Sequence, residues 1–303
     1  MYHFESTTNE KSIKDFLIKN KSNFFIISTY NSSHKISKIS KELKFKFDLC
    51  IFDEAHRTVG TKDKLFSKLL YEKNITIKKR LFMTATKREV KNFKDIVDMS
   101  NLDIYGDIAH EISFKSAIES KNPILCNYQF IALGVSKNEI LDLWKMNPQV
   151  RDSSEPDSTT MRYLCSLLLM FKVIKKHNLK KGITFHNTIS GSENFKSIAS
   201  TYQKYINKKN DFVFFNITSS KSSTGNKNQT LKDFEEDKKS IITNARCLVE
   251  GVDVPAVDLV LFADRKKSKV DIVQAIGRCL RKSEGKTFGY VIVPYIFDPL
   301  LKR

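Results

Sequence analysis

Short apolar runs alternate with longer amphipathic stretches along most of this chain. The apolar runs are residues 24–28, 49–52, 81–84, 130–135, 183–185, 212–215, 241–243, 259–262 and 290–293. Strands that are apolar without a break are typical of parallel sheets covered by helices on both faces. The pattern therefore predicts a doubly wound α/β fold, in which ligands bind at the carboxyl ends of the strands.

The length of 303 residues fits two domains of ordinary size. Pro123 disfavours helix at Asn122, and the strand pattern restarts at Cys126. We therefore expect one domain over residues 1–122 and a second over residues 123–303. The five cysteines form no close pair and no apolar run could span a bilayer, so we expect a cytoplasmic protein with reduced thiols and no membrane partner.

The net charge of +18 suits a phosphate-rich partner such as a nucleic acid. The charge alone leaves a second interpretation open. The chain is rich in Lys, Asn, Ile and Phe together, a mixture that an AT-rich coding sequence produces whatever the protein binds, and runs such as 78–80 could be solvated faces.

Two adjacent carboxylates, Asp53 and Glu54, end one of the apolar strands. Neighbouring acids at a strand tip can divide two tasks: one holds Mg²⁺ through its water shell, and the other takes a proton from an attacking water. This favours Asp53 as the metal ligand and Glu54 as the general base. The alternative is that the pair caps a helix.

A helix is predicted over residues 270–282. At 100° per residue its polar stripe consists of Gln274, Arg278 and Arg281. Its apolar stripe consists of Val273, Ile276 and Leu280. We expect the helix to expose the basic stripe and to bury the apolar one; a merely solvated basic face is the alternative.

These segments resemble, in order, the motifs of superfamily 2 helicases. Residues 53–56 spell the DEAH box, and the resemblance implies that His56 lies at the bound nucleotide. Thr84 and Thr86 resemble the Ser/Thr-Ala-Thr element that couples the ATP site to the nucleic-acid groove, although alone they could cap a helix. Ser28, Thr29 and Tyr30 resemble a further element of these helicases, whose hydroxyls contact the nucleic-acid backbone.

The second half carries two more helicase-like segments. Residues 243–255 resemble motif V, which implies that Thr243 contacts nucleic acid, that Gly251 allows close backbone approach, and that Asp253 reaches the ribose or the nucleotide. Residues 270–282 resemble motif VI. There Gln274 is implied to contact the nucleotide, and Arg278 and Arg281 to act as arginine fingers on the transferring phosphoryl group.

The resemblance implies two RecA-like parallel-sheet domains, ATP and Mg²⁺ as cofactors, and a helicase or translocase activity on nucleic acid. Residues 29–30, 53–58, 81–86 and 250–290 most resemble motors of restriction-modification and phage-defence systems of type I and type ISP. Those motors translocate on duplex DNA, which favours DNA over RNA as the partner.

One expected motif does not occur. The 303 residues contain no Gly-x-x-x-x-Gly-Lys-Ser/Thr string, the P-loop whose amides and lysine bind the β- and γ-phosphates. We therefore expect the first domain to be incomplete at its N-terminus, as a fragment or as half of a split motor completed by an N-terminal polypeptide. A non-catalytic nucleic-acid-binding module is the alternative, so whether the chain alone is an enzyme stays open.

Overall fold

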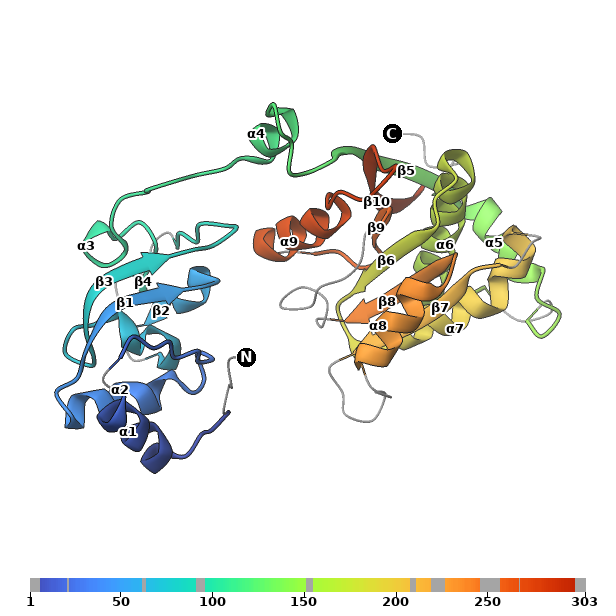
Figure 1. Cartoon of the computed structure of the whole chain (residues 1–303). Helices are drawn as coiled ribbons and strands as arrows, with labels where there is room; N and C mark the ends of the chain where they lie inside the picture. Colours follow the sequence, from blue (N-terminus) through green and yellow to red (C-terminus); the bar gives the residue numbers. More distant parts are fainter. Residues whose placement is uncertain are drawn as a thin grey trace. The chain divides into compact units, whose positions relative to one another are not determined.

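The structure, a computed structural model, describes residues 6–20, 22–61, 64–90, 96–150, 155–207, 211–218, 227–245, 257–266 and 268–297 (Figure 1). The chain divides into two compact units, Met1–Glu111 and Ile112–Arg303. The boundary suggested by sequence, after residue 122, lies within the second unit, between the short helix α4 (Phe114–Glu119) and the first strand of that unit's sheet.

The described part of the second unit contains a sheet of six parallel strands in the order β5-β10-β9-β6-β8-β7. The strands are β5 (Asn127–Ser136), β6 (Lys181–His186), β7 (Val213–Thr218), β8 (Ser240–Ala245), β9 (Leu259–Phe262) and β10 (Phe288–Phe297). Each apolar run of this half of the sequence forms one of them. The predicted α/β class with parallel pairing is confirmed.

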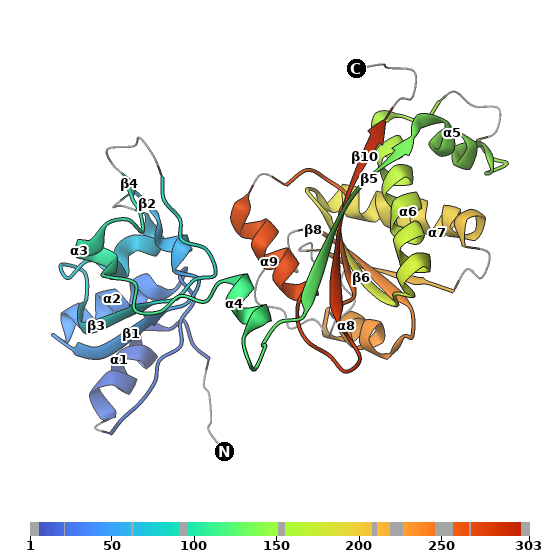
Figure 2. The ribbon, with the colours of Figure 1, turned by 90° about the horizontal axis from the view of Figure 1, so that it is seen from above.

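Helices cover both faces of this sheet (Figure 2). One face packs against α5 (Lys137–Lys145), α6 (Ser158–His177) and α7 (Ile189–Ile206), and the other against α8 (Lys227–Glu236) and α9 (Lys269–Cys279). Successive strand residues alternate between the two cores: Ile241 packs beneath α6 and α7, whereas Ile242 packs beneath α8 and α9. Because the inner strands β6, β8 and β9 are buried on both faces, their apolar runs are continuous.

Local signals define both ends of α6. The side chain of Asp157 accepts hydrogen bonds from the amides of Thr159 (2.7 Å) and Thr160 (3.0 Å), which have no partner within the helix. At the other end Asn178 adopts a left-handed conformation with φ of 51°. Neither α6 nor any other helix among the described residues is long and apolar enough to cross a membrane.

The described part of the first unit contains two small sheets. β1 (Lys46–Phe52) and β3 (Thr76–Phe82) pair in parallel, and β2 (Gly60–Thr61) and β4 (Ile96–Val97) pair antiparallel. Its helices are α1 (Glu10–Lys19), α2 (Ser33–Glu42), α3 (Leu102–Tyr105) and the 3₁₀ helices η1 (Ala55–Thr58) and η2 (Leu65–Leu70). One face of the β1–β3 pair is buried, where Phe52 stacks on Phe82 at 4.8 Å and Phe82 contacts Tyr105 at 4.9 Å.

The opposite face of β1 and β3 is exposed near the carboxyl ends of the strands. Leu49 and Ile51 are each 53% exposed, and Leu81, which pairs with Ile51, is 42% exposed. Exposed side chains this large normally pack against another element, since each buried one contributes roughly 1.5–3 kcal/mol. Within the described residues no element covers them.

The strand predicted over residues 24–28 is wrong. This segment is assigned no regular structure, and Phe25 and Ile27 are 91% and 84% exposed. A strand forms only when its backbone pairs with a neighbour, and the β1–β3 sheet has no other strand among the described residues. Side-chain contacts hold the segment instead, since Phe24 contacts Phe16 at 5.2 Å and Phe45 at 6.0 Å.

The cysteines of the described residues are free thiols, as the scattered spacing predicted. Cys126, Cys165 and Cys279 are buried in the second unit. Burial raises the pKa of Cys165 to about 11 and that of Cys279 to about 12, so both stay protonated near neutral pH and behave as small apolar core residues.

Adjacent residues of β1 should respond in opposite ways to truncation. Phe52 is 2% exposed and Ile51 is 53% exposed. We expect Phe52→Ala to destabilise the first unit by about 3–5 kcal/mol and Ile51→Ala by less than about 1 kcal/mol, because only Phe52 leaves a cavity in a packed core. Hydrogen exchange of amides in β1 and β3, followed by mass spectrometry, measures both. Equal acceleration of exchange in the two variants would contradict this assignment of faces.

Candidate functional site

The acid pair lies where β1 and β3 end together. Phe52 and Phe82, the last residues of the two strands, are register partners. The Met83 amide then donates to the Phe52 carbonyl (2.9 Å), and the Ala55 amide donates to the Met83 carbonyl (2.9 Å). These backbone bonds hold the 53–56 turn against the 84–86 segment, although the two are almost thirty residues apart.

Asp53 is exposed, and its Oδ1 accepts a hydrogen bond from the Glu54 amide (3.0 Å). Glu54 adopts a left-handed backbone conformation with φ of 49° and ψ of 47°. A residue with a Cβ adopts this conformation at a cost of order 1 kcal/mol, and such strain is concentrated at functional sites. The turn leaves the side chain of Asp53 exposed and that of Glu54 partly buried.

His56 connects the acid pair to the hydroxyl segment. It is 6% exposed, and its Nδ1 lies 3.0 Å from Thr84 Oγ1 and 3.3 Å from Glu54 Oε2. Thr84 Oγ1 donates its single proton to the Thr86 carbonyl (3.1 Å) and accepts from the Thr86 amide (3.2 Å). Nδ1 of His56 is therefore the donor to Thr84. The structure thus brings together all five residues predicted at 53–56 and 84–86.

Two residues of the 28–30 segment face solvent, and the third contacts the acid pair. Ser28 and Thr29 are exposed, in the loop that leads into α2. Tyr30 turns inward, where its hydroxyl donates to the Asp53 carbonyl (2.7 Å) and its ring stacks on Phe66 at 5.4 Å. Burial, with a contribution from the charge of Asp53, raises the pKa of Tyr30, so it remains a hydrogen-bond donor. Its position favours support of the acid pair over the nucleic-acid contact expected from sequence.

In the second unit, α9 carries Gln274 and Arg278, and Arg281 follows its end. The predicted division of stripes is confirmed for Ile276, which packs into the core, and for Leu280, which is fully buried, but it is wrong for Val273 and Arg278. The residues that pack into the core under α9 are Ile272, Ala275, Ile276 and Cys279. This set has the i, i+3, i+4, i+7 spacing of a helix face, so Val273 lies beside the core face and Arg278 is only 7% exposed. Arg281 is exposed, as predicted.

The motif V segment is described only at its start. Gly251 and Asp253 lie outside the described residues. Thr243 lies within β8 and is fully buried; its hydroxyl donates to the Phe215 carbonyl (3.2 Å) and accepts from Asn216 Nδ2 (2.8 Å). The hydroxyl expected to contact nucleic acid is therefore used between β7 and β8.

A polar cavity of about 710 Å³, which was not predicted from the sequence, lies at the carboxyl ends of β6 and β9. The cavity is lined by Thr159, Arg162, Tyr163, Asn187, Thr188, Ser190, Gly191, Asn194, Asp264 and Arg265. Arg162 Nη2 pairs with Asp264 Oδ1 at 3.0 Å, and the Asn187 amide donates to Asp264 Oδ2 at 2.9 Å. The available signal was the rule that ligands bind at strand carboxyl ends, together with the Asn187-Thr188 cap that follows β6.

His186 is fully buried beneath this cavity, with Nε2 at 2.9 Å from the Thr184 hydroxyl and the ring against Tyr163 and Phe195. Burial lowers the pKa of His186 to about 4, and the nearby charge of Asp264 only partly opposes this shift. The imidazole is therefore neutral at physiological pH.

The stability of the second unit should fall in mild acid. As the pH falls from 6.5 to about 4, the unfolded chain protonates His186 while the folded chain does not, so stability decreases by up to roughly 3 kcal/mol. His186→Gln should remove this dependence, whereas His177→Gln on α6 should retain it. Urea unfolding followed by fluorescence of Trp144, the single tryptophan, measures the effect. Identical pH dependence in the His186→Gln variant and the parent would contradict the assignment.

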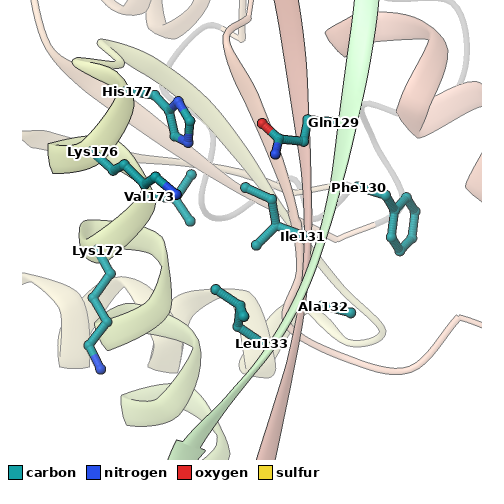
Figure 3. A pocket seen from close by; sticks show the side chains of 9 residues that line it. All are labelled: Gln129, Phe130, Ile131, Ala132, Leu133, Lys172, Val173, Lys176 and His177. Atoms are coloured by element: carbon teal, nitrogen blue, oxygen red, sulfur yellow. The ribbon is translucent and has the colours of Figure 1, made fainter.

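A smaller cavity of about 290 Å³ lies between the edge strand β5 and α6 (Figure 3). Ile131 and Leu133 point toward the helix, where Lys176 and His177 face them, while Phe130 points away. None of the site residues predicted from sequence lines this cavity.

Two family profiles match the chain. The profile described as "Type III restriction enzyme, res subunit" matches residues 2–89, and the profile described as "Helicase conserved C-terminal domain" matches residues 159–283. The first match contains the acid pair and the hydroxyl segment, and the second contains the polar cavity and α9.

Curated relatives and solved structures agree with these matches. A helicase-named protein of African swine fever virus is 27% identical over 297 residues, which cover 96% of this chain and 30% of that protein. The type ISP restriction-modification enzyme LlaBIII, solved bound to DNA, is 27% identical with a TM-score of 0.78, covering 99% of this chain and 22% of its own. The type ISP enzyme LlaGI, solved with a DNA substrate mimic, is 25% identical with a TM-score of 0.58, covering 96% and 19%.

Parallel α/β pairing, together with the match to a helicase C-terminal domain, defines a RecA-like helicase fold. Within that class, the chain belongs to the superfamily 2 helicases of the restriction-enzyme type. It spans about 30% of the length of the African swine fever virus relative.

Proposed function

We propose that this chain forms the core of an ATP-dependent motor that moves along DNA. The observation that carries the proposal is the contact between His56, Glu54 and Thr84, because it joins the candidate catalytic acid to the segment that resembles the coupling element. The type ISP relatives LlaBIII and LlaGI, solved with DNA or a DNA mimic, support DNA as the track.

In this proposal Asp53 holds Mg²⁺ and Glu54 is the general base toward the attacking water. The exposed carboxylate of Asp53 is a hard oxygen donor of the kind that Mg²⁺ prefers. Mg²⁺ neutralises charge on the phosphates of ATP. His56 Nδ1, which donates to Thr84, lies 3.3 Å from Glu54 Oε2, so the imidazole lies beside the proposed proton acceptor.

The arginines of the second unit have a separate role. We assign Arg278 and Arg281 to stabilisation of the transferring phosphoryl group, with Gln274 as a nucleotide contact and Gly251 and Asp253 completing the site. Arginine supplies a planar cation with several donors, which matches the oxygens of a phosphoryl group.

Turnover also requires phosphate-binding amides. The 303 residues contain no P-loop string, and their single Gly-Lys-Thr, at 285–287, leads into β10. Lys286 is not available for phosphate, because its Nζ donates to the carbonyls of Val257 and Cys279 (2.6 Å each). We therefore infer that a P-loop must be supplied by polypeptide outside these residues. The exposed apolar face formed by Leu49, Ile51 and Leu81 could pack against that polypeptide.

The polar cavity between α6, β6 and β9 gives the second unit a contact for the DNA backbone. Arg162 and Arg265 supply cations, and Thr188 and Ser190 supply hydroxyls at the N-terminus of α7, where helix amides favour an anion. Phosphate contacts of this kind position a protein on DNA without reading its sequence.

Glu54→Gln tests the catalytic assignment. With a P-loop segment supplied in frame, the motor should hydrolyse ATP faster when duplex DNA is added, and Glu54→Gln should lower that rate by about 10²–10⁴-fold because a proton acceptor is lost. A matched control is Glu42→Gln on α2, whose carboxylate pairs with Lys14 on the surface. An ATPase rate that Glu54→Gln leaves unchanged would exclude Glu54 as the base.

Binding to DNA can be measured on the chain of 303 residues. We expect the affinity for a fluorescent duplex to fall steeply with salt, by about 10³-fold between 50 and 200 mM if about six phosphates are neutralised. A duplex RNA of equal length serves as the comparison. Salt-dependent binding without turnover, even after a P-loop is supplied, would instead favour the non-catalytic binding module. Tighter binding of RNA would exclude DNA as the preferred track.

A further inference from the structure

One of the two arginines that line the polar cavity, Arg162, is held by an acid. Arg162 Nη2 lies 3.0 Å from Asp264 Oδ1. The side chain of Arg162 is 45% exposed, whereas that of Asp264 is only 9% exposed. The cation therefore reaches solvent while its counterion remains inside, which is the arrangement of a cation that can change partners.

Asp264 is anchored independently of this ion pair. Its Oδ2 accepts a hydrogen bond from the Asn187 amide (2.9 Å), and the Asn187 side chain donates to the Arg265 carbonyl (3.1 Å). These bonds tie the end of β6 to the segment after β9. Asp264 therefore keeps its position whichever group Arg162 contacts.

The packing beside Asp264 leaves no room for a side chain at position 191. A Cβ at Gly191, in the first turn of α7, would lie 2.7 Å from the Tyr163 hydroxyl and 2.9 Å from Thr188 Oγ1. The guanidinium of Arg162 lies 5.3 Å from the centre of the Tyr163 ring, which gives it a second support when it leaves the carboxylate. The cation can thus turn toward an incoming anion without losing all of its contacts.

The buried carboxylate competes with any phosphate that enters the cavity. Arg162 and Arg265 attract a phosphate oxygen, and so does the N-terminus of α7. Asp264 opposes it in two ways, because it repels the anion and holds Arg162. Breaking the pair leaves a buried carboxylate without its cation, which is costly.

We propose that Asp264 limits the affinity of this cavity for phosphate groups by holding Arg162, which is released to the phosphate when the ligand binds. The proposal rests on the proposed DNA-binding function of the second unit. A moderate affinity at each phosphate suits a protein that must release and rebind the backbone as it moves. Asp264 is thus a positioning residue that sets affinity through Arg162.

Asp264→Asn is the direct test, because an asparagine side-chain oxygen still accepts from the Asn187 amide but carries no charge for Arg162. We expect the 303-residue chain with this change to bind a fluorescent DNA duplex about tenfold more tightly. The slope of log affinity against log salt should steepen by about 0.9, the value for one added phosphate contact. Asp142→Asn on α5 changes the net charge equally, at an exposed carboxylate that does not line the cavity, and should leave both quantities unchanged.

The double variant Asp264→Asn, Arg162→Gln assigns the gain to Arg162. It should return the affinity to within about threefold of the parent. If it remains about tenfold tighter, or if Asp264→Asn binds neither the duplex nor free phosphate more tightly than the parent, the proposal is overturned. Unfolding of each variant by urea, followed by Trp144 fluorescence, establishes that the second unit is intact.

A second measurement separates the ligand sources. Sodium phosphate, titrated into the parent and the Asp264→Asn variant at constant ionic strength and followed by calorimetry, shows whether free phosphate occupies the cavity. A gain for phosphate alone supports the Arg162 exchange with a free anion as ligand, and a gain for the duplex alone supports the DNA backbone. If the parent binds no duplex at all, the proposed function fails, whatever Asp264→Asn does with phosphate.

Discussion

The parallel register of β1 and β3 is the constraint on which the candidate catalytic site depends. Because Phe52 and Phe82 end their strands side by side, the two turns that follow them share backbone hydrogen bonds through Met83. Those bonds bring Glu54, His56 and Thr84 within hydrogen-bonding distance. A shift of the pairing by one residue would move the buried aromatic rings to the opposite face and separate the two turns.

In the second unit, too, polar side chains meet where parallel strands end. Its inner strands β6, β8 and β9 are buried on both faces, so their polar groups reach solvent only where the strands end. There Arg162, Asp264 and the N-terminus of α7 meet at one cavity, with neutral His186 beneath it. A charged imidazole at that depth would be repelled by the guanidinium of Arg162, and burial keeps the imidazole neutral.

The two units differ in how completely their sheets are covered. In the second unit helices bury both faces of the inner strands, and large side chains such as Phe130 are exposed at the edge strand β5; in the first unit Leu49, Ile51 and Leu81 remain exposed on one face of the β1–β3 pair. The named relatives are longer than this chain, which spans 30% of the African swine fever virus protein and 22% of LlaBIII. Additional polypeptide that covers the exposed face is consistent with the proposed requirement for a P-loop.

The sequence by itself determined the fold class, the strands of the second unit and the adjacency of the acids, because these depend on local patterns of apolar and charged residues. It misassigned residues 24–28 as a strand and predicted that Arg278 of α9 is exposed although it is buried, because strand pairing and helix orientation depend on neighbours far along the chain. Only the tertiary structure decided that Tyr30 supports Asp53. It also decided that Arg162 pairs with Asp264, which lies about one hundred positions further along the chain. Such contacts follow from strand order, and no local pattern of residues encodes that order.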